Sequence, residues 1–518
     1  MGVTSFLHSF YNPVTKRSCC RDNMQTKEQG ALRIIGSLTA IAARHRKKKV
    51  MKGSLKRQKG RKKMKNSEKT VLTGKAKGLF GFLSGLCFLV IIFHASAWAA
   101  ASVGCRVDID REILPAGSPQ KAIIKVTLDA PPAPKRNERP AVNLAIVLDR
   151  SGSMSGEKLA KAKDAAIEAL RRLGPNDIFS LVIYDHVVET IIPAQSAGNT
   201  EWIEPRIRQI RAGGSTALFG GVSQAASEVR KNLQRRYVNR IILLSDGLAN
   251  VGPSSPDDLG RLGASLIKED ISVSTVGVGT DYNEDLMTRL SQNSDGNSYF
   301  VESSRDLPRI FAAELGDVLN VVAKRVQVII ECPDGVRPLS VIGREGRIRG
   351  RHVEFFLNQL YGGKKKYALI EVMVSEGKEG EKRDVAYARV SYENPSSKKN
   401  ETSTGKVIAR FSRDQGAVDK SVNVDVQKEY HLNQNALVQE QAISLSDKGK
   451  NEEAVKALES SAGKLREFGA KYNDEEILRK ADELKRQATQ IDREGMSRKS
   501  RKVLRTDSYQ MKNQQSSE

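Results

Sequence analysis

The chain has 518 residues, of which 39% are hydrophobic and 28% charged, and its formal net charge is +24. This length exceeds one ordinary core, so we expect two or three domains in a soluble globular protein. Residues 1–77 hold 21 Lys and Arg against 3 Asp and Glu, a net of +18, which leaves +6 on the other 441 residues. The folded part is therefore only mildly basic, and we expect no nucleic-acid partner.

The first 63 residues are basic and are predicted to be disordered or a misassigned extension. Met64 is the more natural start, because a signal peptide rarely begins so deep in a chain. The basic run from Arg44 to Lys65 leaves nucleic-acid binding as an alternative. A secretory segment follows it directly, which argues against that alternative.

Residues 64–101 are predicted to be a signal peptide or a membrane anchor. Lysines precede an apolar run from Gly78 to Phe93, and an Ala-x-Ala site follows at Ala97–Ala99. An apolar core of about 15 residues is shorter than the roughly 20 of a spanning helix, which favours cleavage over a retained anchor. We therefore expect export: a periplasmic, extracellular or inner-membrane-anchored protein with its bulk outside the cytoplasm.

Two segments of strand character flank the middle of the chain. Residues 102–138 hold one strand pair around a turn at Pro115–Gly117, which is too little to fold alone. Residues 322–430 hold five short strands, the last of them "SVNVDVQ". We expect the two segments to form one split β-sandwich, which would place Cys105 and Cys332 in one domain. A disulfide between them and two reduced thiols both remain open.

Between the two segments, residues 139–321 alternate buried strands with helices. "VNLAIVL" is a near-continuous apolar strand, and the next segment, Glu157–Leu173, has apolar residues at helical spacing. The same alternation continues to a last helix at Leu307–Asn320. This pattern predicts an α/β domain with a mostly parallel, Rossmann-like sheet and helices on both faces, inserted in the sandwich.

The end of the chain is predicted to be helical and then disordered. Residues 431–495 carry apolar residues at helical spacing in a hairpin or three-helix tail, including a helix at Asn435–Ser446. Residues 496–518 are polar and are expected to be a disordered tail.

Oxygen-bearing side chains stand where three segments of the predicted sheet should meet. Asp149, Ser151 and Ser153 follow the first strand at every second position, Thr216 precedes a helix, and Asp246 ends a strand. The carboxyl ends of parallel strands form one edge, so we expect these groups to converge. Such hard donors suit Mg²⁺, with Mn²⁺ or Ca²⁺ as alternatives. Helix capping alone would explain the first loop but not Thr216 and Asp246.

Other polar residues give weaker indications. Asp185 and His186 are explained by a turn between two strands, and Asp281, Glu284 and Asp285 by a helix cap and its first turn. His352 and His431 stand alone, and neither a nucleophile–base pair nor a phosphate loop is present. We therefore expect no catalytic residues and no enzyme activity.

The segment "DRSGSMSG", with Thr216 downstream and a strand-final "SDG", resembles the metal-ion-dependent adhesion site of von Willebrand factor type A (VWA) domains. The resemblance covers about residues 141–320. It implies that Ser151, Ser153 and Thr216 coordinate a cation through their hydroxyls, while Asp149 and Asp246 act directly or through water. One position is left for an acidic side chain of a partner. The wider chain resembles bacterial secreted VWA proteins related to inter-alpha-trypsin inhibitor heavy chains.

Two functions follow as hypotheses. The first is an exported, divalent-cation-dependent binding module that captures an Asp or Glu of a partner protein. By analogy, the helix at Leu307–Asn320 would couple this capture to the sandwich. The alternative is a metal-bearing accessory or chaperone subunit of a cell-envelope enzyme complex, docked through the helical tail. A pull-down that fails after deletion of residues 433–495, but not after Asp149→Ala, would favour the alternative.

Overall fold

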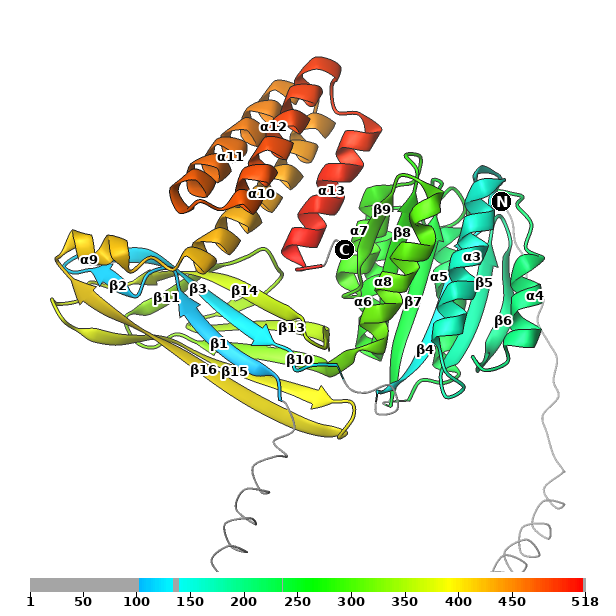
Figure 1. Cartoon of the computed structure of the whole chain (residues 1–518), viewed down its shortest axis with the longest axis horizontal. Helices are drawn as coiled ribbons and strands as arrows, with labels where there is room; N and C mark the ends of the chain where they lie inside the picture. Colours follow the sequence, from blue (N-terminus) through cyan, green and yellow to red (C-terminus); the bar gives the residue numbers. More distant parts are fainter. Residues whose placement is uncertain (1–101, 134–138, 235, 516–518) are drawn as a thin grey trace, which may run out of the picture. The chain divides into compact units, whose positions relative to one another are not determined.

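The computed structural model describes residues 102–133, 139–234 and 236–515, shown in Figure 1. The predicted basic extension and the signal or anchor segment lie outside these residues. Within the described ranges, we find no helix with the length and apolar character needed to cross a membrane.

The middle of the chain forms one six-stranded sheet with the order β6-β5-β4-β7-β8-β9. Its strands are β4 (Ala141–Asp149), β5 (Ile178–Tyr184), β6 (Val188–Ser196), β7 (Tyr237–Ser245), β8 (Ile271–Val278) and β9 (Ser298–Val301). Only β6 runs antiparallel to its neighbour. Every residue of β7 is buried, so the strand shows no apolar–polar alternation, although its buried residues include Asn239 and Arg240.

Helices cover both faces of this sheet, as Figure 1 shows. One apolar cluster joins the sheet to α3 (Glu157–Arg172), α4 (Thr200–Arg208) and α8 (Leu307–Leu319). A second cluster joins it to α5 (Leu218–Arg230), α6 (Pro256–Leu266) and α7 (Glu284–Asn293). Three short 3₁₀ turns complete the domain, η1 (Gly152–Met154), η2 (Ile267–Glu269) and η3 (Ser304–Asp306). The predicted Rossmann-like class is confirmed.

The flanking segments build a two-sheet sandwich. A four-stranded sheet has the order β1 (Gly104–Ile109), β3 (Gln120–Asp129), β14 (Lys365–Val374), β11 (Val336–Ile342). A six-stranded sheet has the order β12 (Arg347–Arg349), β13 (His352–Tyr361), β10 (Val321–Glu331), β15 (Lys382–Asn394), β16 (Lys399–Ser412), β2 (Ile113–Pro115). Since β3 pairs with β14 along ten residues, the strands before and after the α/β domain share one core, and the predicted insertion is confirmed.

One predicted strand of the sandwich is wrong. The segment "SVNVDVQ" lies at the start of α10 (Val424–Asp447), and α9 (Gln415–Lys420) precedes it. Asn423 caps α10, because its side chain accepts a hydrogen bond from the backbone N–H of Val426. An N-cap asparagine satisfies a free helix donor and outweighs the strand-like alternation around it.

The tail contains four helices rather than three. After α10 come α11 (Asn451–Tyr472), α12 (Glu475–Glu494) and α13 (Arg498–Lys512), so the prediction of a disordered end is wrong as far as residue 515. Ser497 caps α13, and Leu504 and Tyr509 are buried in it. The helix looks polar because its remaining side chains are mostly charged, and these charges find partners far away in the sequence.

Both cysteines of the described chain are free thiols. Cys105 lies in β1 and Cys332 follows β10, so both belong to the sandwich. Burial raises the pKa of each thiol to about 11. Of the two alternatives left open by the sequence, the structure has the reduced pair.

Candidate metal centre

The five predicted ligand residues meet at the carboxyl edge of the six-stranded sheet. Asp149 ends β4, and Asp246 directly follows β7, the parallel neighbour of β4. A Cβ added at Gly247 would lie 3.4 Å from Ser153 Oγ and 3.5 Å from Thr216 Oγ1. Hydroxyls from two separate loops therefore both lie close to Gly247, the residue after Asp246.

Asp149 is held rigidly at the base of the site. Its Oδ1 accepts the backbone N–H of Ser151 at 2.8 Å, and its Oδ2 accepts the hydroxyls of Ser245 at 2.7 Å and Tyr184 at 3.3 Å. Burial raises the pKa of this carboxyl, opposed by the hydrogen bonds from Ser151 and Ser245, and the nearby Asp246 raises it further. A negative charge at this depth is costly unless a cation compensates it.

The two serines link the first loop to Asp246. Ser151 Oγ and Ser153 Oγ lie 3.1 Å apart, and the Ser153 hydroxyl donates to Asp246 Oδ1 at 2.7 Å. Ser151 and Thr216 are buried, whereas Ser153 is exposed, so the cluster reaches the surface.

The second loop is fixed from both sides. The backbone N–H of Thr216 donates to the Asn250 side chain at 2.8 Å, and the N–H of Asn250 donates back to the Thr216 carbonyl. On the other side, Ala217 N–H donates to the Asp185 carbonyl at 2.7 Å. Gly214 has φ +75°, and a Cβ there would collide with His186, so this close approach requires glycine.

The donor chemistry of the cluster fits a hard divalent cation. All five side chains offer oxygen only, two as carboxylates and three as hydroxyls, which is a set suited to Mg²⁺. Across the described part of the chain, no group of three or more His, Cys, Asp or Glu is placed to hold a metal. The hydroxyls are therefore essential to any ion site here.

Sequence reasoning missed Lys158, whose Nζ lies 2.5 Å from Asp246 Oδ2. It also missed the supporting Ser245, Tyr184 and Asn250, which carry no local spacing signal. Lys158 does carry one, because it stands in the first turn of α3, where the helix dipole disfavours a cation. A lysine at that position, directly after the ligand loop, indicates an anionic group nearby, which the structure identifies as Asp246.

The remaining candidates behave as the simpler interpretations predicted. Asp185 shapes a turn by accepting the backbone N–H of Val187, and it pairs with Arg150. Glu284 and Asp285 lie in the first turn of α7 as expected, but the cap is Asn283. Asp281 lies before the helix and pairs instead with Arg498. His352 is exposed on β13, and His431 packs against Phe468.

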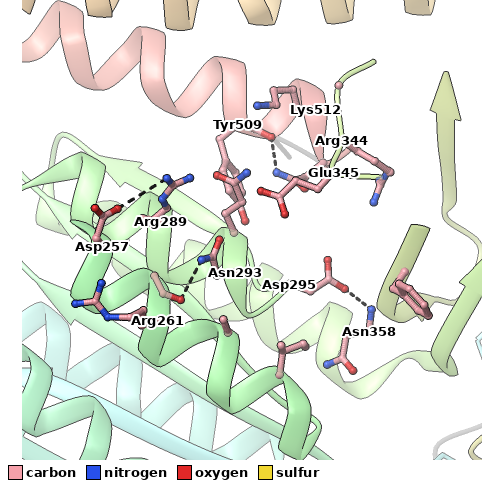
Figure 2. Close-up of a pocket in the computed structure, with 17 residues that line it drawn as sticks. Asp257, Arg261, Arg289, Asn293, Asp295, Arg344, Glu345, Asn358, Tyr509 and Lys512 are labelled. Carbon is pink, nitrogen blue, oxygen red and sulfur yellow. Dashed lines mark hydrogen bonds and ion pairs between the residues drawn. The ribbon is translucent and has the colours of Figure 1, made fainter. Parts of the chain in front are cut away.

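A separate cavity of about 540 Å³ lies between α6, α7, α13 and the β11–β12 turn, as Figure 2 shows. Among its lining residues, Arg289 lies 4.0 Å from Asp257, and Asp295 accepts the backbone N–H of Asn358. Arg261 and Lys512 pair with acids outside the lining, Asp258 and Glu440. None of its lining residues belongs to the candidate metal centre, and we assign no reaction to this cavity.

Comparisons with known proteins agree with this architecture. The family model of the von Willebrand factor type A domain matches residues 143–313. The chain is 29% identical over 292 residues to the uncharacterized protein YfbK of Escherichia coli (strain K12), covering 55% of this chain and 50% of that protein. It is 27% identical over 190 residues to human inter-alpha-trypsin inhibitor heavy chain H4, covering 35% of this chain and 20% of that one.

A solved structure shows the same fold. The von Willebrand factor type A protein from Catenulispora acidiphila superposes with a TM-score of 0.58 at 17% identity, over 73% of this chain and 90% of that one. This chain spans half or less of the two curated relatives named above, so the likeness covers the domain and its surroundings rather than those whole proteins.

Proposed function

We propose, on the premise that this chain carries a von Willebrand factor type A domain, that the domain binds a partner protein through one divalent cation. Asp149, Ser151, Ser153, Thr216 and Asp246 would hold the cation, with Mg²⁺ the first choice and Mn²⁺ or Ca²⁺ as alternatives. The partner would contribute an Asp or Glu carboxylate. VWA domains are in general interaction modules, which supports binding rather than catalysis as the role.

One observation carries this proposal: Ser153 Oγ and Thr216 Oγ1, from different loops, both lie close to Gly247, next to Asp246, which accepts the Ser153 hydroxyl. Helix capping needs no such convergence, and neither Ser151 nor Ser153 makes a side-chain cap to α3 or η1. A shared ligand explains why the chain brings these polar groups together at one point.

The charge balance supports capture of an acid. Two carboxylates would neutralise a divalent ion, and the three hydroxyls add no charge. Mg²⁺ in proteins commonly keeps several waters, which an incoming carboxylate oxygen can replace. A bound ion would supply Lewis acidity at the surface, and the chain's own groups would orient it and hold it in place.

Exposed apolar side chains lie on the loops that contact the Thr216 loop, and they suit a protein partner. Leu248 is 58% exposed, Val187 50% and Val251 36%, and they belong to the two loops that hold Thr216. Arg211, on the loop before Thr216, is exposed as well. A carboxylate flanked by apolar residues would fit this surface in both charge and polarity.

We also infer export, supported by the signal-like sequence of residues 64–101. Cleavage after the Ala-x-Ala site would leave a mature amino terminus near Ala100. Sequencing the amino terminus of protein recovered from outside the cytoplasm tests this inference. A mature chain that still carries residues 64–99 would support a retained anchor instead.

Water-proton relaxation with Mn²⁺ tests the binding proposal. The wild type should bind Mn²⁺ with exchangeable water on the ion, and a glutamate-containing peptide should displace that water while its glutamine analogue does not. The double variant Ser151→Ala, Ser153→Ala should lose the ion, whereas Ser227→Ala, an exposed serine of α5, should retain it. Equal Mn²⁺ binding by the double variant would contradict the proposal.

A further inference from the structure

Lys158 provides the candidate metal centre with a positive charge from the protein itself. It is the second residue of α3, and its side chain is 33% exposed. Its ammonium lies 2.5 Å from Oδ2 of Asp246, whose side chain is fully buried. The other oxygen of the same carboxylate, Oδ1, accepts the Ser153 hydroxyl. Asp246 is thus shared between the ligand cluster and the lysine.

This position is unfavourable for a lysine unless Asp246 needs it. The first turn of a helix disfavours cations, because the free N–H groups carry partial positive charge. Holding a long side chain in one rotamer also costs conformational entropy. Against these costs stands the larger penalty of a buried carboxylate without a cation, beside the second carboxylate of Asp149.

The neighbouring Lys161 shows what an ordinary lysine of α3 does. Its ammonium lies 3.9 Å from the exposed Asp164, one turn along the same helix, and its side chain is half-buried, much like that of Lys158. Lys158 instead reaches back from the helix to the strand-end loops, where its Nζ also approaches the loop at Gly279. Its position therefore reflects the centre and not the helix surface.

We propose that Lys158 is the counter-ion of the metal-free centre and competes with the divalent cation for Asp246. The inference rests on the proposed function, because it concerns the same site. In the absence of metal, the ammonium compensates Asp246 and keeps the two buried carboxylates compatible. When a divalent ion binds, the ammonium repels it and must withdraw, so Lys158 sets the affinity of the centre.

The substitution Lys158→Met removes the charge but keeps an unbranched apolar stem, and Lys161→Met is the matched control. Calorimetry of the full chain should show divalent affinity at least about tenfold tighter in Lys158→Met, since one competing charge is gone. Lys161→Met should stay within about twofold of the wild type, as expected of a surface pair. Lys158→Arg keeps the charge and should keep the affinity close to that of the wild type.

Stability provides a second readout that does not depend on partner binding. In EDTA, Lys158→Met should unfold at lower urea than the wild type, because the buried carboxylate of Asp246 has then lost its ammonium partner, and saturating Mg²⁺ should remove the difference. Unchanged or weaker ion affinity in Lys158→Met would overturn the inference.

The two proposals fail in different ways. If the wild type takes up no ion while Lys158→Met does, competition by the lysine is supported and metal-dependent capture by the wild type is contradicted. If neither chain takes up Mn²⁺ or Mg²⁺, both proposals are overturned. If the wild type and Lys158→Met bind the ion equally, the proposed function stands and the lysine inference fails.

Discussion

The candidate metal centre and the contact between α7 and α13 treat buried acidic groups in opposite ways. At the centre, Asp149 has only hydroxyl and amide donors, and Asp246 has one lysine. At α7, Glu284 pairs with Arg501 and Lys502, and Asp285 pairs with Arg501 and Arg505. The candidate metal centre has fewer positive side chains than carboxylates. At the contact between α7 and α13, arginines and a lysine of α13 balance the two carboxylates.

The pKa directions express the same difference. Burial raises the pKa of Asp149, and its hydrogen bonds do not offset that effect. At Asp285 burial acts in the same direction, but Arg505 and Arg501 outweigh it and hold the pKa below its ordinary value. Acidic side chains that pair with arginines and lysines of the same chain stabilise the fold. Acidic side chains that lack enough such partners are placed to bind an added cation.

Deletion of residues 496–518 should have the largest effect. It removes α13, exposes the surface that buries Leu504 and Tyr509, and leaves Glu284 and Asp285 without cations. We expect the free energy of unfolding to fall by about 4 kcal/mol, from lost burial and broken ion pairs, as measured by urea denaturation. Divalent affinity should stay unchanged, and a parallel loss of ion binding would contradict the independence of the two regions.

Asp246→Asn should affect divalent-ion binding at the candidate metal centre and leave the contact between α7 and α13 unchanged. Removing one of the two ligand carboxylates should weaken divalent binding by about 100-fold, measured by calorimetry. The exposed Asp257→Asn in α6 serves as the control and should leave the affinity intact. Equal losses in the two variants would indicate a general charge effect rather than a site.

Two arginines of α13 test whether burial determines how much an ion pair between α7 and α13 stabilises the chain. Arg501 is 21% exposed and contacts three acids, so Arg501→Ala should destabilise the chain by about 2 kcal/mol in urea unfolding. Arg498, 77% exposed and paired with the exposed Asp281, should contribute less than about 0.5 kcal/mol when replaced by alanine. Similar losses would show that burial does not govern these pairs.

Asp285 and Asp149 should contribute pH dependences of opposite sign to the free energy of unfolding. Both contributions should be smaller than the effects of the substitutions above. The depressed pKa of Asp285 gives stability that is present above its unfolded pKa and lost as pH falls through the folded value. The raised pKa of Asp149 gives stability that is present at low pH and lost as pH rises through the folded value. Urea unfolding of Asp285→Asn and Asp149→Asn in EDTA, across acidic to neutral pH, should show each slope removed separately.

Much of the fold could be predicted because its signals are local. The apolar run of β4 and the spacing of Asp149, Ser151 and Ser153 lie within about a dozen residues, so strand, loop and ligand pattern are visible together. Asp246 could be added because parallel strands end at a common edge, and Thr216 because it stands directly before a helix in a glycine-rich loop. The split sandwich followed from a strand pair too small to fold alone.

Most of the misses share one physical cause, which is a partner far away in the sequence. The wrong strand at residues 421–427 is the exception, because Asn423 caps α10 locally. Arg501 and Lys502 lie more than 200 positions from the acids of α7, so α13 was predicted as a polar, disordered tail. Lys158 lies 88 positions from Asp246, and Asn250 lies 34 from Thr216. No periodicity in the chain reports such pairs, although the unusual place of Lys158 at a helix amino terminus is a usable signal.

The most direct test of the central claim is an anomalous difference map from crystals of this protein grown with Mn²⁺. The account predicts a single strong peak within coordination distance of the hydroxyls of Ser151, Ser153 and Thr216, with both Asp149 and Asp246 close to it. A map without a peak at that point, from a protein whose β4 and β7 loops are well ordered, would contradict it.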